Sequence, residues 1–206
     1  MQLRVFNIIK NTKVEGPGNR YCIWVQGCSR HCKGCQAVHT WSHKGGELYY
    51  VKDIIEDIFK VANIISPHPN PPPRGGNYVY PKNENNASCK ELTHQENFSI
   101  EGVTFLGGEP FEQAEALGVI AEKIKKAGLS VVCFTGCKFE DLKLEAKNKK
   151  LLDNIDLLID GEYIEELKDF SRPWCGSSNQ RYHFLTDPSH TGRRICLSSW
   201  ISRLSF

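Results

Sequence analysis

Three cysteines lie within eight residues of this chain, at spacings of four and three: Cys28, Cys32 and Cys35. Thiolates are soft ligands that select iron–sulfur clusters, zinc or copper(I). An iron–sulfur cube ordinarily takes four thiolates, one for each iron. The sequence has no fourth cysteine at ligand spacing. Three ligands on a cube would leave one iron open to bind and activate a substrate.

A structural zinc site is the alternative that these residues leave open. Zinc also uses clustered cysteines, usually as two pairs or as pairs of cysteine and histidine. His31 or His39 could complete such a set. Metal analysis of anaerobically purified protein separates the two, because a cube carries four irons with four sulfides and a zinc site carries no sulfide.

A second stretch with chemical potential is Gly107-Gly108-Glu109-Pro110, which directly follows a predicted strand at 100–106. Two glycines let the backbone approach a ligand closely. The Glu109 carboxylate suits an ammonium group. Alone, this stretch is typical of a tight turn. The three-cysteine loop also follows a predicted strand, at 21–26, so we expect both stretches to project from one edge of one sheet.

The elements that must position these residues follow from apolar periodicity. Strands are predicted at 3–8 (as an edge strand), 21–26, 100–106, 129–134 and 155–160, with further possible strands at 182–185 and 195–201. Helices are predicted at 51–65, at 112–127 with Gly128 as its C-cap, and around 139–146. This alternation of strand and helix is typical of an α/β fold with a parallel sheet and right-handed crossovers.

The chain of 206 residues is most simply one domain, 1–206, with one insertion. Residues 66–97 hold six of the ten prolines and six asparagines. That composition is typical of an exposed surface insertion and not of a second domain.

The charge balance is nearly even, with 26 basic and 24 acidic side chains and a net charge of +2. This excludes the electrostatic footprint of a nucleic-acid-binding protein. Lysine clusters at 123–126 and 147–150 are interpreted as solvated helix faces. No signal-peptide pattern or membrane-length apolar run is present, so we expect a cytoplasmic protein without a membrane partner. In that setting nine cysteines favour metal binding or catalysis over disulfides.

The Cys-x₃-Cys-x₂-Cys loop together with Gly-Gly-Glu-Pro resembles the radical S-adenosylmethionine superfamily. More narrowly, the chain resembles the family of activating proteins for anaerobic ribonucleoside-triphosphate reductases. The segments that carry the resemblance are 16–20, 25–28, 32–35, 104–110, 160–161 and 176–181.

The resemblance implies an incomplete (β/α) barrel with a mostly parallel sheet. It implies that Cys28, Cys32 and Cys35 hold a 4Fe–4S cluster whose open iron binds S-adenosylmethionine. Glu109 would lie near the ammonium group of that cofactor. The implied cofactor-binding residues are Gly34, Gln36, Gly107, Gly108, Glu109, Thr135 and Gly136.

The implied reaction needs no catalytic side chain beyond the cluster. The reduced cluster passes one electron to the sulfonium, and the resulting 5′-deoxyadenosyl radical takes hydrogen from a glycine of the large reductase subunit. The electron would come from flavodoxin or ferredoxin. Two alternatives stay open: a radical enzyme acting on a small molecule or on another glycyl-radical enzyme, and a non-enzymatic zinc or electron-transfer module.

The family resemblance does not explain four features of the sequence. Cys137 stands where the family usually has an aromatic residue, and residues 36–39 replace an Asn-containing stretch. Arg20 is interpreted either as a partner contact or as a turn cap. Asp160 is either an ordinary strand-end residue or part of the site.

Overall fold

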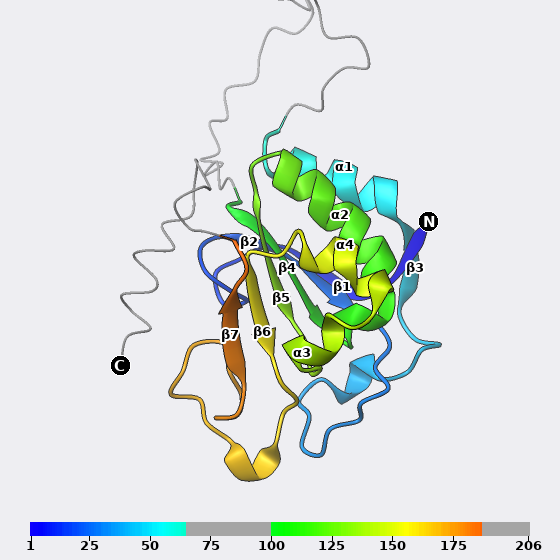
Figure 1. Cartoon of the computed structure of the whole chain (residues 1–206). Helices are drawn as coiled ribbons and strands as arrows, with labels where there is room; N and C mark the ends of the chain where they lie inside the picture. The colour runs from blue at the N-terminus through cyan, green and yellow to red at the C-terminus, as the bar shows by residue number, and fades with distance from the viewer. Residues whose placement is uncertain (65–99, 187–206) are drawn as a thin grey trace, which may run out of the picture.

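A seven-stranded sheet runs through the residues that the computed structural model describes, 1–64 and 100–186 (Figure 1). The strand order is β3-β1-β2-β4-β5-β6-β7. The strands are β1 (Gln2–Thr12), β2 (Arg20–Val25), β3 (Glu47–Tyr50), β4 (Gly102–Gly107), β5 (Ser130–Phe134), β6 (Leu157–Asp160) and β7 (Arg181–Phe184). Strands β2, β4, β5 and β6 are parallel, whereas β1, β3 and β7 pair antiparallel. The predicted α/β fold with a mostly parallel central sheet is therefore confirmed.

Within the described residues this sheet is open, because β3 and β7 lie at opposite edges. The strand predicted at 3–8 is found as β1, but it is not an edge strand, since β3 pairs with its first half. The sequence did not indicate β3, whose four residues are all exposed and show no apolar alternation. The predicted insertion at 66–97 and the possible strand at 195–201 lie outside the described residues and stay predictions.

Both faces of the central strands are covered, as a parallel sheet requires. Val131 and Leu158 belong to the large core on the helix side, while Val132 and Ile159 belong to a smaller core on the other side with Cys175. This alternation follows from the two-residue period of a strand. Because β2, β4, β5 and β6 are parallel, their carboxyl ends all lie at the lower edge of the sheet in Figure 1, where the long loops lie.

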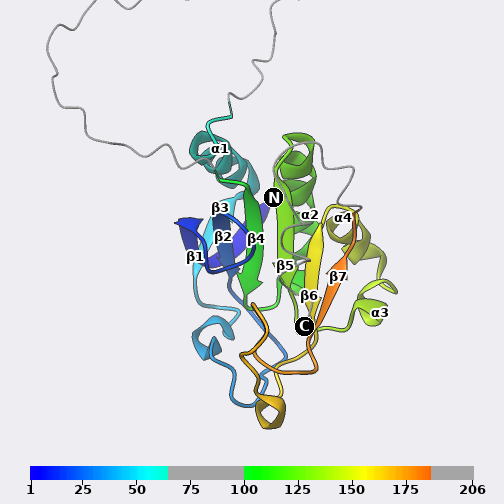
Figure 2. The same ribbon diagram turned by 90° about the vertical axis from the view of Figure 1, so that its left-hand side faces the viewer.

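The helices α1 (Val51–Val61), α2 (Ala114–Lys126) and α4 (Lys149–Leu152) pack on one face of the sheet (Figures 1 and 2). Helix α1 buries Val51, Ile54 and Ile58, as expected from apolar periodicity, but it ends at Val61 and not at the predicted residue 65. Helix α2 follows a 3₁₀ turn at Pro110–Gln113 and ends, as predicted, before Gly128, whose φ is +80°. The helix predicted around 139–146 is instead α3 (Phe139–Leu142) followed by a 3₁₀ turn.

Arg20 lies at the amino end of β2, at the edge of the sheet opposite the cysteine loop. Its side chain is buried and donates hydrogen bonds to Thr104 Oγ1 and to Ser130 Oγ, and to the carbonyl oxygens of Val103 and Ser130. Burial lowers the pKa of Arg20 to about 10. The residue fastens β2 to β4 and β5, so the prediction of a partner contact is wrong.

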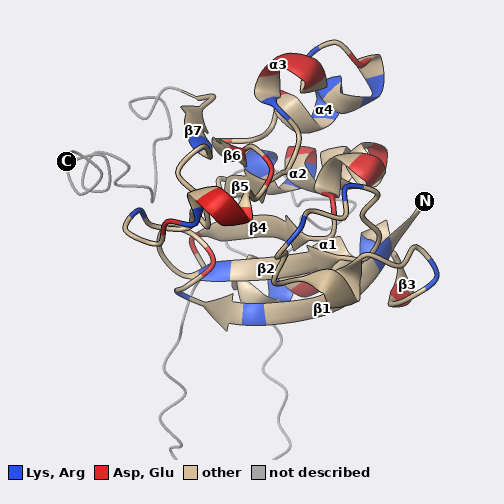
Figure 3. Cartoon of the chain, turned by 90° about the horizontal axis from the view of Figure 1, so that it is seen from below, with Lys and Arg blue, Asp and Glu red and all other residues tan. Residues whose placement is uncertain are grey.

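Basic and acidic residues are interspersed along the elements of the chain (Figure 3). Most lysines of the two predicted clusters are exposed, and Lys126 and Lys150 pair with Glu122 at the surface, which confirms the solvated faces. Lys125 is the exception, because it pairs with the buried Asp156. No helix in residues 1–64 and 100–186 is long and apolar enough to cross a membrane.

Candidate functional site

The three-cysteine loop begins where β2 ends. Gly27 takes a φ of +106°, a conformation that favours glycine, and turns the chain out of the strand. Its N–H donates to Thr40 O (2.7 Å), and the Cys28 N–H donates to Trp41 O (3.0 Å). These two hydrogen bonds close the loop on itself, so the cysteines are held at the carboxyl edge of the sheet.

One pocket at this edge brings the three thiols together with most of the predicted cofactor residues. The predicted residues that line it are Cys28, Cys32, Cys35, Gly107, Gly108, Glu109, Thr135 and Gly136. The other lining residues are Arg30, Trp41, Phe134, Gly161, Tyr163 and Gln180. Gly161 also follows a strand end, a signal that could have found it, whereas nothing in the sequence singled out Arg30, Trp41 or Tyr163.

Two predicted cofactor residues do not line this pocket. A Cβ on Gly34 would come within 2.9 Å of the Glu165 carboxyl carbon, so this glycine makes room for the turn at Glu165–Leu167. Gln36 is exposed. The cofactor roles of these two residues stay predictions.

Gly107 and Gly108 allow two backbone segments to touch. Gly107 has a φ of +103°, and a Cβ on Gly108 would lie 2.2 Å from Gly27 O. The Gly108 N–H donates to Val25 O (2.8 Å) and the Glu109 N–H donates to Gly27 O (2.9 Å). The glycines therefore let the turn after β4 lie against the start of the cysteine loop.

Glu112 joins the same two segments a second time. Its Oε1 accepts a hydrogen bond from the Ser29 N–H (2.7 Å), and its Oε2 lies 2.7 Å from His43 Nε2. Burial raises the pKa of Glu112, but the hydrogen bonds from His43 and Ser29 outweigh this and hold it below its ordinary value. The carboxylate thus stays ionised and holds the backbone beside Cys28.

Glu109 is buried, with only 2% of its surface exposed. Its carboxylate accepts three hydrogen bonds: from the N–H of Phe111 (3.1 Å), the hydroxyl of Thr135 (2.7 Å) and the N–H of Gly136 (2.9 Å). Burial raises the pKa of Glu109. A carboxylate has about four acceptor positions, so about one is left for a ligand donor such as an ammonium group.

Asp160 ends β6 but does not line the pocket. Its buried carboxylate accepts from the Phe139 N–H (2.7 Å) and pairs with Arg181 and His183 of β7. Arg181 also pairs with Glu140. Asp160 therefore fixes α3 and β7 around the end of β6.

We expect Asp160→Asn to destabilise the protein by about 2–4 kcal/mol at pH 7, because a buried carboxylate with charged partners is lost. Burial raises the pKa of Asp160, but hydrogen bonds from Arg181, Phe139 and His183 outweigh this and lower it below 3.8. The stabilisation is therefore present above about pH 3.8 and is lost as the pH falls through the folded-state pKa. The difference in unfolding midpoint between wild type and variant should narrow as the pH falls below about 3.8; a difference that stays constant contradicts this.

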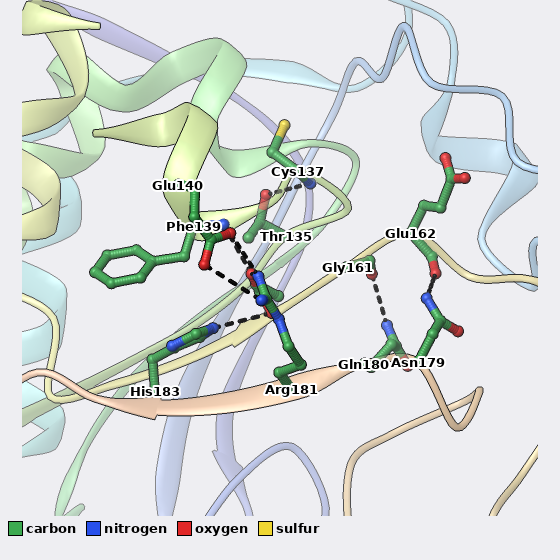
Figure 4. Close-up of polar contacts among 11 residues, drawn as sticks. Thr135, Cys137, Phe139, Glu140, Gly161, Glu162, Asn179, Gln180, Arg181 and His183 are labelled. Carbon is green, nitrogen blue, oxygen red and sulfur yellow. Dashed lines mark hydrogen bonds and ion pairs between the residues drawn. The ribbon is translucent and has the colours of Figure 1, made fainter. Parts of the chain in front are cut away.

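Residues 176–180 gain a role that the sequence did not reveal. Gln180 Nε2 donates to Gly161 O (3.0 Å), and Gln180 Oε1 accepts from the Gly176 N–H (2.7 Å). Asn179 Nδ2 donates to Glu162 O (2.9 Å; Figure 4). These amides tie the loop before β7 to the chain after β6, and so they shape the pocket wall at Gly161.

Cys137 and the two histidines near the cysteine loop lie outside the pocket lining. Cys137 is half-buried, and its N–H donates to Thr135 Oγ1 (3.0 Å). The His31 ring stacks on Trp41, and the His39 ring packs against Phe6. The structure therefore brings neither histidine into a zinc set with the cysteines.

The donor set fits a cluster with one thiolate per iron. All seven cysteines in the described ranges are free, and three of them line this pocket. Within those ranges, no three His, Cys, Asp or Glu side chains lie close enough to hold one metal ion. A cube needs no such convergence, because each cysteine binds a different iron.

Comparison with known proteins gives a family and several relatives. The family model described as 4Fe-4S single cluster domain matches residues 14–183. An anaerobic ribonucleoside-triphosphate reductase-activating protein of Escherichia coli (strain K12) is 27% identical over 176 residues, which cover 84% of this chain and 92% of the relative. Proteins of the same name from Salmonella typhimurium (26% identical; 84% and 92% covered) and Enterobacteria phage T4 (27% identical; 84% and 89% covered) are similarly related.

Proposed function

Because this chain belongs to the family of 4Fe-4S single cluster domains, we propose that it is a radical S-adenosylmethionine activase that installs a glycyl radical on an anaerobic ribonucleoside-triphosphate reductase. The observation that carries the proposal is the pocket that joins Cys28, Cys32 and Cys35 to the turn at 107–109. The names of the relatives support the choice of target.

In this proposal the three thiolates hold a 4Fe–4S cluster, and the cluster and S-adenosylmethionine together supply a 5′-deoxyadenosyl radical. The chain's own residues bind and orient. Glu109 offers its remaining acceptor position to the cofactor ammonium, while Thr135 and Gly136 hold that carboxylate in place. Trp41, Phe134 and Tyr163 give the pocket apolar walls, which help to exclude water.

The proposal extends to fold and partners. The open sheet is proposed to be the incomplete (β/α) barrel of the radical S-adenosylmethionine type, with residues 1–206 as one domain. The large reductase subunit would bind at the carboxyl edge of the sheet, because the radical must reach its glycine. A flavodoxin or ferredoxin is proposed as the electron donor.

The test is to mix the anaerobically reconstituted protein with S-adenosylmethionine, a reductant and a large anaerobic reductase subunit. A glycyl-radical signal by electron paramagnetic resonance is the expected result. Cofactor cleavage without that signal would favour a radical enzyme acting on a small molecule or on another glycyl-radical enzyme. Purified protein that holds zinc and no sulfide would overturn the proposal.

A further inference from the structure

Arg30 lies in the cysteine loop, between Cys28 and Cys32, and lines the pocket. Among the described residues that line it, Arg30 is the only cation and Glu109 the only carboxylate. The structure therefore places one charge of each sign beside the three thiols. No role for this arginine follows from cluster binding, which needs only the cysteines.

The arginine is held in place by three neighbours. Its Nη2 pairs with Glu162 Oε2 (2.8 Å), and its Nη1 lies 3.6 Å from Cys137 Sγ. A Cβ on Gly136 would come within 2.4 Å of Arg30 Nε, so the glycine makes room for the guanidinium. The side chain is 28% exposed. These contacts fix the guanidinium at the pocket wall.

The Nε–H of Arg30 is buried and has no acceptor among the described residues. An unmatched buried donor is unfavourable, and a carboxylate oxygen is the acceptor that pairs most strongly with an arginine N–H. The amino-acid end of S-adenosylmethionine carries an ammonium and a carboxylate. One acidic and one basic side chain in a single pocket match these two charges.

We propose that Arg30 binds the carboxylate of S-adenosylmethionine and so makes the pocket selective for an intact amino-acid end. This inference rests on the proposed function, since it names a contact to the same cofactor. Arg30 would select among sulfonium nucleotides, while Glu109 faces the ammonium that such ligands share.

The test compares S-adenosylmethionine with its decarboxylated form, which keeps the ammonium and the sulfonium. Binding to the full, cluster-loaded chain is measured by anaerobic calorimetry, so the readout does not depend on turnover. Wild type should prefer S-adenosylmethionine, and Arg30→Gln should reduce that preference by about tenfold or more, the usual effect of losing a charge-assisted hydrogen bond. Iron content measured on the same samples confirms that the cluster is present.

Lys33→Gln is the matched control. Lys33 is a cation of the same loop, but it pairs with Glu165 and Glu166 and does not line the pocket, so the preference should stay unchanged. Gly136→Ala is a second variant, because its methyl group displaces the guanidinium and should reduce the preference while Arg30 is intact.

The outcomes separate the two proposals. If Arg30→Gln and Gly136→Ala bind both nucleotides with the wild-type ratio, Arg30 only packs and the inference is overturned, although the proposed function stands. If the wild-type protein with its cluster binds neither nucleotide, the proposed function fails and the inference falls with it.

Discussion

Replacing Cys28, Cys32 or Cys35 with alanine, one at a time, should reduce bound iron and sulfide to background and abolish reductive cleavage of S-adenosylmethionine. The three thiols line one pocket, and the described part of the chain offers no fourth cysteine there. A cube that loses one of three thiolates has a second iron without a protein ligand. Metal and sulfide analysis after anaerobic reconstitution checks the first effect, and release of 5′-deoxyadenosine checks the second.

Cys137→Ala is the control for these variants. Cys137 is half-buried like the three cysteines, but it does not line their pocket. The variant should keep the iron and sulfide of the wild type. Iron lost from Cys137→Ala, or kept by any of the three pocket variants, would show that the ligand set is wrong.

Replacing Glu109 should weaken both stability and cofactor binding. Glu109→Ala removes the acceptor of three hydrogen bonds, from Phe111, Thr135 and Gly136. Each buried donor left without an acceptor costs about 1–3 kcal/mol. Glu109→Gln keeps the volume and one oxygen, so it should lose about 1–3 kcal/mol, which is roughly 3–10 °C in Tm for a chain of this size.

The measurements are thermal unfolding and calorimetric binding of S-adenosylmethionine. Both Glu109 variants should bind it at least about tenfold more weakly, because the negative charge that faces the ammonium is lost. Glu115→Gln, an exposed change in the first turn of α2, is the control and should alter neither quantity appreciably. Wild-type affinity in Glu109→Gln would leave Glu109 with a structural role only.

Most of the fold could be predicted because its elements carry apolar periodicity. The strands before residues 28, 107 and 135 were found this way, and their carboxyl ends meet where the site lies. The helix predicted around 139–146 is present but ends early, at Leu142, for a local reason. Asn148 Nδ2 donates to Leu142 O (3.0 Å), a carbonyl that a continuing helix would have paired with the N–H of Ala146.

The site could be predicted where residues that are adjacent in the sequence act together. It could not be predicted where residues from distant loops meet only in the folded chain. Gly107 and Glu109 could be predicted as site residues because they directly follow a predicted strand. Arg30 did not, because its partners Gly136 and Glu162 lie more than a hundred residues away and only the folded chain brings them together. The amides at 179–180 carried a family resemblance, but their contacts with residues 161 and 162 needed the structure.

The double connection between the cysteine loop and the turn after β4 has a thermodynamic consequence. The Glu109 N–H donates to Gly27 O, and the Glu112 carboxylate accepts from the Ser29 N–H. Neither the cysteine loop nor the turn after β4 can therefore shift without the other. Binding of the iron–sulfur cluster to the cysteine loop would therefore preorganise the turn after β4, which is proposed to bind S-adenosylmethionine. Such coupling is reciprocal in binding free energy, so saturating S-adenosylmethionine should reduce the amount of iron that a chelator removes at equilibrium.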